Sequence, residues 1–384
     1  MHNKADYIKS AIQYRIACAI FYFISGFGYA TWASRIPTIK QQLHLNDAQL
    51  GTVLFALPVG LMLTMPITSK LLMHYSSRII MLIGSLVLTV VLIMIGITNN
   101  IWQLIIILFC FGSARNLLTL SINTQGVAVQ NLYTKSIMAT FHGIWSMAGF
   151  AGAAFGLLMV YFNINPFWHF LLVGVVLTII TFLTINQTYY QQPLPDNRKP
   201  VFSLPDKYLI KYSFICFACM ACENTMYDWS ALYFQKVVNP DKTMATAAFV
   251  IYLIAMTSGR FFGDKLVSKV GIKPVLRFSG LFIFSGLMLS VLLPYVFPVI
   301  VGFIMVGLGV SCIVPMVFSL AGKSDKMNSS SALASISTIG YLGFVLIPPF
   351  VGYISQLVSL RLSFGIIAFF GIIIMWLVLK IKDQ

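Results

Sequence analysis

The sequence predicts an all-α membrane protein, with twelve transmembrane helices in two six-helix pseudo-repeat bundles and both termini in the cytoplasm. Of the 384 residues, 59% are hydrophobic and only 9% are charged, which is far more apolar than a soluble globular domain. Charge-free stretches such as residues 79–97 and 167–183 are about long enough to cross a hydrocarbon core as helices. They do not alternate apolar and polar residues as barrel strands do.

Spans of roughly 20 apolar residues, separated by short polar breaks, mark the expected helices. We expect them at residues 13–35, 48–69, 79–98, 101–130, 137–162, 166–186, 208–234, 244–262, 274–295, 297–319, 332–356 and 360–379. The longest break, QTYYQQPLPDNRKPVFSLPDK, contains four prolines and separates six helices from six. The sequence therefore predicts an N-terminal bundle over 1–187, a cytoplasmic linker over 188–207 and a C-terminal bundle over 208–384.

The lysines and arginines predict the orientation in the membrane. An even number of spans places both termini on one side, and cytoplasmic loops are enriched in these residues. The loops on the terminal side hold 19 of the 25 basic side chains and the opposite loops hold 5, with Arg115 inside a helix. This asymmetry also accounts for the net charge of +15. No basic face or motif of a nucleic-acid-binding domain is present, so we expect no nucleic-acid partner.

Weak internal similarity supports two equivalent halves. At an offset of 197 residues, Trp32 aligns with Trp229, whereas the charged Arg115 aligns with Cys312. Glu223 likewise has no charged counterpart in the first half. The charges are therefore additions to the repeat and candidates for function.

The segment GRFFGDKLVSKVG, residues 259–271, is similar to the loop signature that the major facilitator superfamily carries between the second and third helices of a half. Gly263, Asp264 and Gly271 stand at matching positions. With twelve helices in two halves and a proline-rich central loop, the chain resembles that superfamily over essentially its whole length. The resemblance implies a cytoplasmic gating loop in which Asp264 caps or pairs at a helix end. The first-half counterpart, TSKLLMHYSSR, has serine and lysine in place of the glycine and aspartate.

Within the superfamily, the chain looks most like the bacterial YbjJ-like branch near the fucose permeases. The matching pieces are SRIPTIKQQLHLNDAQLGTVLFALPVG, INTQGVAVQ, FHGIWSMAG, MYDWSALYF and GYLGFVLIPPFVGY. The resemblance implies a monomeric transporter of the bacterial inner membrane that is not an enzyme and needs no cofactor. No phosphate-binding loop, nucleophile elbow or metal-ligand cluster indicates ATP-driven transport, catalysis or a metal site. At Thr119 that branch often has an aspartate, so no proton site is carried over to the fourth helix.

Two charges lie near the middle of their spans. An ionised side chain near the bilayer centre costs at least about 2.5 to 3.5 kcal/mol, so such residues face protein or a watery cavity. Glu223 is the only glutamate in the chain. We predict that Glu223 takes up a proton or binds solute and that Arg115 sets its protonation state. The alternatives are a static salt bridge or two separately satisfied polar groups. Asp228 lies about 140° around the helix from Glu223, and we expect it to be structural.

The solute cavity is expected along a polar stripe of the fourth helix, where Arg115 and three neutral polar residues fall within about 100° of arc. Aromatic residues at matched positions in three other helices complete the prediction. The predicted cavity residues are Asn116, Thr119, Asn123, Trp32, Trp145, Tyr227 and Trp229. The alternatives are ordinary helix packing for the tryptophans and hydrogen bonds between helices for the amides.

Two further patterns are open to a structural interpretation. The CxxCxxC spacing of Cys216, Cys219 and Cys222 lies on one apolar helix, where we expect small packing residues. Pro348 and Pro349 interrupt backbone bonding in the eleventh helix and form either a gating hinge or a fixed kink.

These features predict a secondary active transporter that moves a small polar solute, sugar-like or a small organic acid, by alternating access with proton coupling. Its expected partners are the solute, protons and the lipid bilayer. One alternative is a proton-driven efflux antiporter for amphipathic compounds. Another, from a different class, is a membrane sensor or scaffold that transports nothing.

Overall fold

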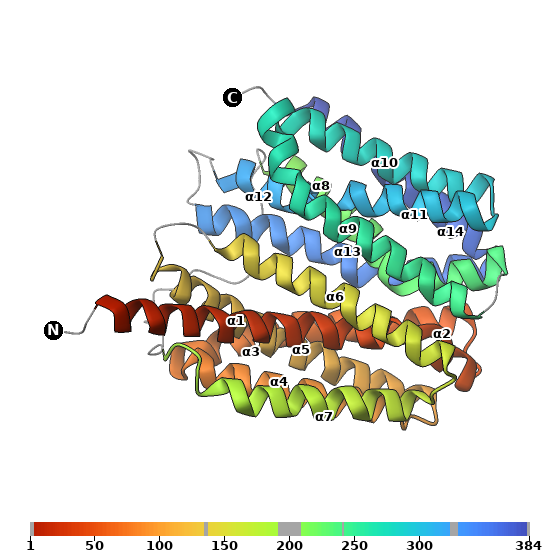
Figure 1. The fold of residues 1–384 in the computed structure, drawn as a ribbon. Helices are drawn as coiled ribbons and strands as arrows, with labels where there is room; N and C mark the ends of the chain where they lie inside the picture. Colours follow the sequence, from red (N-terminus) through yellow and green to blue (C-terminus); the bar gives the residue numbers. More distant parts are fainter. Residues whose placement is uncertain (1–3, 134–136, 191–208, 240–241, 323–328, 382–384) are drawn as a thin grey trace. The chain divides into compact units, whose positions relative to one another are not determined.

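The computed structural model describes residues 4–133, 137–190, 209–239, 242–322 and 329–381, and the regular structure of these residues is helical (Figure 1). The chain divides into two units. The first unit comprises Met1–Ile39 and Ala56–Arg198, and the second comprises Lys40–Phe55 and Lys199–Gln384. Residues 40–55 group with the second unit, whereas the predicted N-terminal bundle includes them, and the units divide again between Arg198 and Lys199, within the predicted linker. The predicted linker, residues 188–207, lies outside the described residues from 191 onward.

The first unit contains five whole helices. They are α1 (Lys4–Ala33), α4 (Ser77–Ile95), α5 (Ile101–Gln130), α6 (Met138–Tyr161) and α7 (Pro166–Ile185). Helix α1 packs along α6, and α4 packs on α5 and lies side by side with α7 (Figure 1). Two further helices, α2 (Ile36–Gln42) and α3 (Asp47–His74), are each divided between the units.

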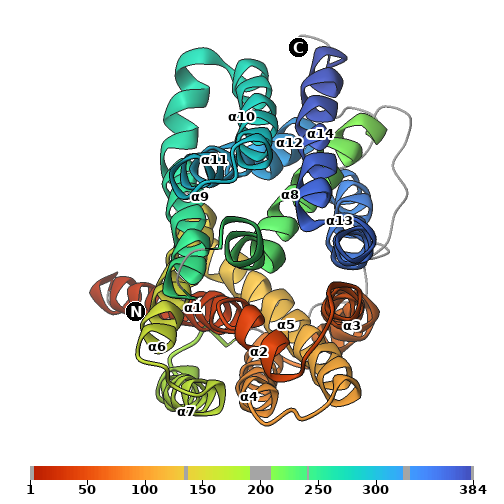
Figure 2. The same cartoon turned by 90° about the vertical axis from the view of Figure 1, so that its right-hand side faces the viewer.

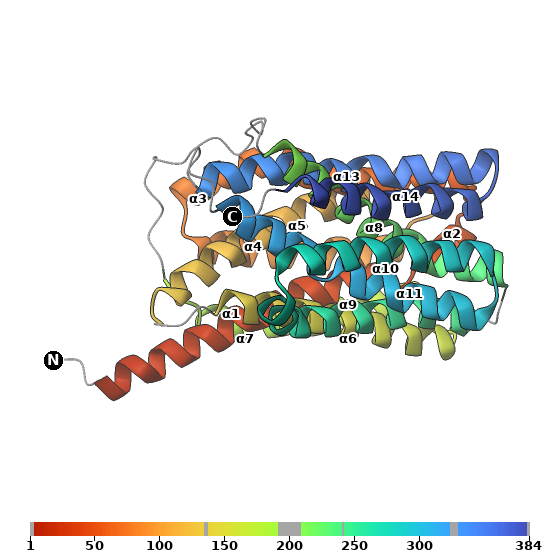
Figure 3. The same cartoon turned by 90° about the horizontal axis from the view of Figure 1, so that it is seen from above.

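The second unit repeats this pattern of pairing. Its helices are α8 (Ile210–Tyr233), the π-helical turn η1 (Phe234–Val238), α9 (Lys242–Val270), α10 (Ile272–Leu292), α11 (Val296–Val310), α12 (Ile313–Gly322), α13 (Ser329–Leu357) and α14 (Leu360–Leu379). Helix α8 packs along α13, as α1 does along α6, and α10 packs on α11 and α14 (Figure 2). Helices α13 and α14 lie side by side (Figure 3).

Each predicted span corresponds to a helix, which confirms the all-helical membrane fold. The span expected at 297–319 is broken into α11 and α12, because Pro315 has no N–H for the carbonyl of Ser311. By length and apolar composition, eleven segments of the described chain are able to cross a membrane. Helix α8 falls outside that set because its polar and charged residues, Lys211, Glu223 and Asp228 among them, lower its mean hydropathy.

Helix ends follow ordinary capping chemistry. The side chain of Asn100 accepts from the N–H of Gln103 at 3.0 Å, and Ser359 accepts from the N–H of Leu362 at 3.1 Å. Asn165 caps α7 with Pro166 in its first turn. These caps satisfy backbone donors that would otherwise be left open where the chain enters the apolar region.

Close helix contacts within the first unit depend on glycine. A Cβ at Gly112 would lie 1.9 Å from the backbone oxygen of Leu57, and one at Gly60 would lie 2.1 Å from the oxygen of Phe109. Neither neighbour is able to yield, because both are backbone atoms. Helices α3 and α5 therefore touch backbone to backbone, as small residues allow in membranes.

We predict that Gly112→Ala lowers the free energy of unfolding by about 1 to 3 kcal/mol, because its methyl group overpacks this contact. Gly365→Ala is the matched control, since the nearest atom to its new methyl group would be a methyl carbon of Val291 at 3.8 Å, an ordinary van der Waals contact. Thermal unfolding in detergent measures both variants. Equal midpoints for the two would contradict the close α3–α5 contact.

Candidate functional site

Glu223 forms an ion pair inside the second unit. Its side chain lies on α8, and Arg260 Nη2 on α9 is 3.4 Å from its Oε1. Glu223 is 9% exposed. The sequence groups Arg260 with the cytoplasmic loop residues, but α9 continues to Val270 and carries Arg260 within the helix. The structure therefore supplies a cationic partner that sequence analysis missed.

Aromatic rings surround the next turn of α8. The ring of Tyr227 meets those of Phe249 and Tyr252 edge-on, at centroid distances of 5.6 and 6.0 Å. Tyr252 donates a hydrogen bond to the sulfur of Met256 at 3.6 Å. Tyr227 is thus one turn from Glu223, as predicted, and it is held against α9.

Asp228 and the two matched tryptophans are buried. Asn224 Nδ2 donates to Asp228 Oδ2 at 3.1 Å, one turn back along α8. Trp229 is 0% exposed and Trp32 is 1% exposed, whereas Trp145 is half-buried. A solute therefore reaches the rings of Trp32 and Trp229 only if neighbouring side chains move. Stacking of a solute on these rings stays a prediction.

Arg115 lies in the first unit against an aromatic face. Its guanidinium carbon is 3.7 Å from the centroid of the Tyr29 ring on α1, a geometry in which the ring quadrupole attracts the cation. Arg115 is half-buried. Because Arg115 and Glu223 belong to different units, their predicted pairing stays a prediction.

The polar stripe of α5 bonds to neighbouring helices of its own unit. The hydroxyl of Thr68 donates to Asn116 Oδ1 at 2.7 Å, and the hydroxyl of Tyr22 donates to Asn123 Oδ1 at 2.7 Å. Asn116 is buried, whereas Asn123 and Thr119 are half-buried. These amides join helices, and Asn123 and Thr119 retain partly exposed surface for the predicted solute contact.

The signature loop lies where α9 meets α10. Gly263 falls inside α9, where a Cβ would lie 2.3 Å from the sulfur of Cys312. Gly271 separates the two helices with φ of 86°, a conformation that side-chain-bearing residues rarely adopt. The backbone of Asp264 belongs to α9 and its side chain lies outside the described residues, so its gating role stays a prediction.

The cysteines of α8 face different neighbours. The thiol of Cys219 donates to the carbonyl of Val310 at 3.6 Å, and that of Cys222 donates to the carbonyl of Ile367 at 3.8 Å. Both side chains are fully buried. They fill space against α11 and α14, as expected of small packing residues.

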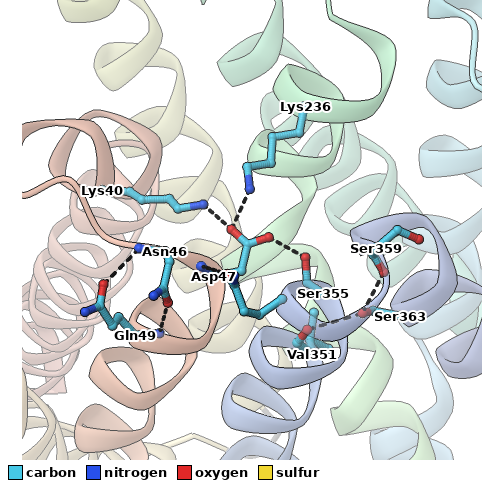
Figure 4. Close-up of polar contacts among 10 residues, drawn as sticks. Lys40, Asn46, Asp47, Gln49, Lys236, Val351, Ser355, Ser359 and Ser363 are labelled. Carbon is cyan, nitrogen blue, oxygen red and sulfur yellow. Dashed lines mark hydrogen bonds and ion pairs between the residues drawn. The ribbon is translucent and has the colours of Figure 1, made fainter.

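Asp47, in the first turn of α3, is a buried carboxylate whose three side-chain partners the sequence did not reveal. Its carboxylate accepts from Lys40, from Lys236 at 2.6 Å and from the hydroxyl of Ser355 (Figure 4). Its backbone N–H donates to Gln356 Oε1 at 3.2 Å. All five residues belong to the second unit. We call Asp47, Lys40, Lys236, Ser355 and Gln356 the Asp47 cluster.

Local sequence fixes where Asp47 stands. Gln49 N–H donates to Asn46 Oδ1 at 2.8 Å, and Asn46 N–H donates to Gln49 Oε1 at 3.0 Å, which forms a reciprocal cap (Figure 4). Asp47 therefore starts the helix, where the helix dipole favours an anion. The motif LNDAQL signals this cap, but no sequence pattern signals partners that lie 189 and 308 residues away.

Arg35 forms a second buried polar group, in the first unit. Its Nε donates to His169 Nδ1 at 3.0 Å and its Nη2 donates to the carbonyl of Ile164 at 2.9 Å. Arg35 is 2% exposed. Burial lowers the pKa of Arg35 to about 10, so the side chain stays charged at neutral pH. It ties the chain between α1 and α2 to the start of α7.

Comparison with known proteins decides the family. The model described as Major Facilitator Superfamily matches residues 18–328 and 214–383. The chain belongs to the Major Facilitator Superfamily. The members of this family are transporters and not enzymes, so the chain is a multi-pass membrane transporter.

Individual relatives agree with this assignment. An uncharacterized MFS-type transporter of Yersinia pestis is 32% identical over 368 residues, which cover 96% of this chain and 95% of the relative. The membrane protein MosC of Rhizobium meliloti is 26% identical and covers 93% of this chain and 88% of its own. The relatives are bacterial.

Solved structures share the fold. A mutant form of the nucleoside transporter NupG has a TM-score of 0.79 at 13% identity, with 97% of this chain and 100% of that chain covered. A bacterial homologue of the human lysosomal transporter Spinster, inward-facing and occupied, has a TM-score of 0.73 at 14% identity, with 96% of each chain covered.

The Asp47 cluster leads to a prediction about Lys40. Burial lowers the pKa of Lys40 to about 8 and the neighbouring Lys236 ammonium adds to this, whereas Asp47 opposes it. The folded protein therefore releases this proton before an unfolded chain does, whose lysine pKa is 10.5. Between these values the unfolded chain binds more protons, so the free energy of unfolding rises with pH from about 8 to 10.5.

Amine-specific labelling followed by mass spectrometry measures this pKa. The rate of labelling of Lys40 should rise with a midpoint near pH 8 in the folded protein and near 10.5 in denaturant. The same midpoint in both states would contradict the assigned environment.

Proposed function

We propose that this transporter moves a small polar solute, sugar-like or a small organic acid, across the bacterial inner membrane by alternating access, and that Glu223 couples the movement to protons. The observation that carries the proposal is the ion pair between Arg260 and the only glutamate, buried on α8. Replacing a buried ion pair by apolar residues of similar volume often leaves the stability of a protein unchanged or raises it. Stability alone is therefore a weak reason for a buried pair at this position.

Arg260 and a proton compete for the same carboxylate. When Glu223 binds a proton, its attraction to Arg260 falls, which favours a turn of the guanidinium toward another acceptor. A change in the distance between the two residues likewise changes how readily Glu223 takes up a proton. This reciprocity is what couples a proton to a conformational change.

In the first unit, Arg115 is a second cation that is able to attract a carboxylate. Its contact with Tyr29 holds the cation against the face of an aromatic ring. In the proposal, Arg115 serves as a second cation that the deprotonated carboxylate of Glu223 or an anionic solute attracts. The Asn123 and Thr119 side chains, half-buried on the same stripe, supply neutral polar contacts to the solute.

The topology and solute class rest on the sequence. The excess of basic residues on the terminal side supports cytoplasmic termini. The resemblance to the YbjJ-like branch near the fucose permeases supports a small polar solute and a monomer, and the motifs that carry it contain no substrate signature. In this proposal the bundles that move are residues 1–187 and 208–384.

We predict that Glu223→Gln abolishes proton-driven accumulation and leaves solute exchange intact. The purified protein is first screened against sugars, polyols, nucleosides and small organic acids by thermal stabilisation, and hits are tested in proteoliposomes. A gradient of one pH unit is worth about 1.4 kcal/mol per proton, which sustains about tenfold accumulation. The wild type should approach that ratio and Glu223→Gln should stay near unity.

Asp228→Asn is the matched control, since it replaces another buried acid on the same helix. It should accumulate solute as the wild type does. Accumulation by Glu223→Gln at the wild-type level would show that the glutamate is structural. Extrusion in place of uptake would identify an efflux antiporter, and binding without flux would identify a sensor.

A further inference from the structure

Helix α3 changes neighbours within three turns. Its residues 47–55 group with the second unit and its residues 56–74 with the first. A Cβ at Gly51 would lie 2.7 Å from the carbonyl oxygen of Pro348 and 3.0 Å from the Cα of Gly352, both on α13. Two turns later, the backbone of α3 touches α5 at Leu57 and Gly60. The first part of α3 therefore packs within the second unit, and the remainder packs within the first unit.

A proline stands at the point of division. Pro58 lies inside α3 and provides no N–H for the carbonyl of Leu54, so one hydrogen bond of the helix is missing there. Helices bend most easily at such a position. The units divide between Phe55 and Ala56, which falls within the turn that Pro58 weakens.

The Asp47 cluster fastens the short arm of this helix. Asp47 is 4% exposed and binds Lys236 of η1 and Ser355 of α13 as well as Lys40 (Figure 4). Further along α3, Thr52 Oγ1 lies 3.1 Å from the hydroxyl of Tyr353 on α13. Charged, neutral and backbone contacts thus act together on residues 40–55.

The Asp47 carboxylate supplies the negative charge that holds the two lysines of the cluster together. Two ammonium groups share one carboxylate, so without it the two lysines repel each other. Lys40 is 7% exposed, which prevents water from screening its charge fully. Loss of the negative charge therefore removes the attraction of Asp47 for both lysines and leaves the repulsion between Lys40, on α2, and Lys236, on η1.

We infer that residues 40–55 form a detachable clasp, which Asp47 fastens to the second unit and which swings about Pro58 when the fastening opens. The inference rests on the proposed alternating access, for which it supplies a named fastening point. The clasp closes one conformation through the Asp47 cluster and the contact of Gly51 with α13. When these contacts break, residues 40–55 separate from the second unit by bending of α3 at Pro58.

Distances between spin labels test the clasp without any solute. Gln42 and Val358 are exposed, one on the clasp and one beyond α13. Both are changed to cysteine in the full-length protein, with Cys110→Ser to remove the exposed native thiol. Pulsed electron paramagnetic resonance in proteoliposomes then reports the populations of short and long distances.

Asp47→Asn should raise the ratio of long to short distances by at least about tenfold. Asp47→Glu should keep the short distance dominant, because it keeps the carboxylate. Pro58→Ala in the Asp47→Asn background should reduce the long-distance population. Arg361→Gln is the control, since it removes an exposed charge that bonds to the carbonyls of Val291 and Leu292.

If Asp47→Asn does not fold, Lys236→Gln gives the same test, because this side chain is 46% exposed and its loss leaves the buried Lys40–Asp47 pair intact. It should shift the ratio in the same direction by a smaller factor. Distances that match the wild type in the folded variants would overturn the clasp. If the distances shift but no solute is transported, the clasp is supported and the proposed transport function is wrong. If proton-driven transport occurs but the distances in the variants do not change, the transport function is supported and the clasp is wrong.

Discussion

The need to compensate charge inside an apolar helical protein governs this structure. An ionised group held away from water is costly unless a partner stabilises it. Glu223 has Arg260, Asp47 has two lysines, and Arg35 has a histidine and a backbone carbonyl. Arg115 lies on an aromatic ring. Each of these pairings fixes two helices or a helix and a loop at a defined register.

The two buried carboxylates of the second unit are held differently. Asp47 accepts hydrogen bonds from three side chains at the start of a helix, where the backbone dipole also favours its charge. Glu223 lies within α8, and its contact with Arg260 is longer, at 3.4 Å. A carboxylate bound by two lysines and a hydroxyl suits a fastening, and a carboxylate paired with an arginine within a helix suits exchange of a proton. The proposed roles of the two residues follow this difference.

Glycine and proline determine where the helices approach and where they yield. Gly112 and Gly60 bring α3 and α5 into backbone contact, and Gly51 does the same for α3 and α13. Such contacts are rigid, because no side chain is present to adjust. Pro58 weakens α3 between them. Stiff contacts on both sides of a weak turn concentrate any movement of α3 at that turn.

The sequence alone determined the fold class, the positions of the spans and the family resemblance, and it singled out Glu223 as a candidate, because apolar run length, charge scarcity and short motifs are local properties of the chain. Only the tertiary structure decided that Arg260 pairs with Glu223, that Asn116 bonds to Thr68 and that Asp47 gathers partners 189 and 308 residues away. Those contacts depend on which faces of distant helices meet, and helix packing sets that register through the positions of small residues throughout the bundle.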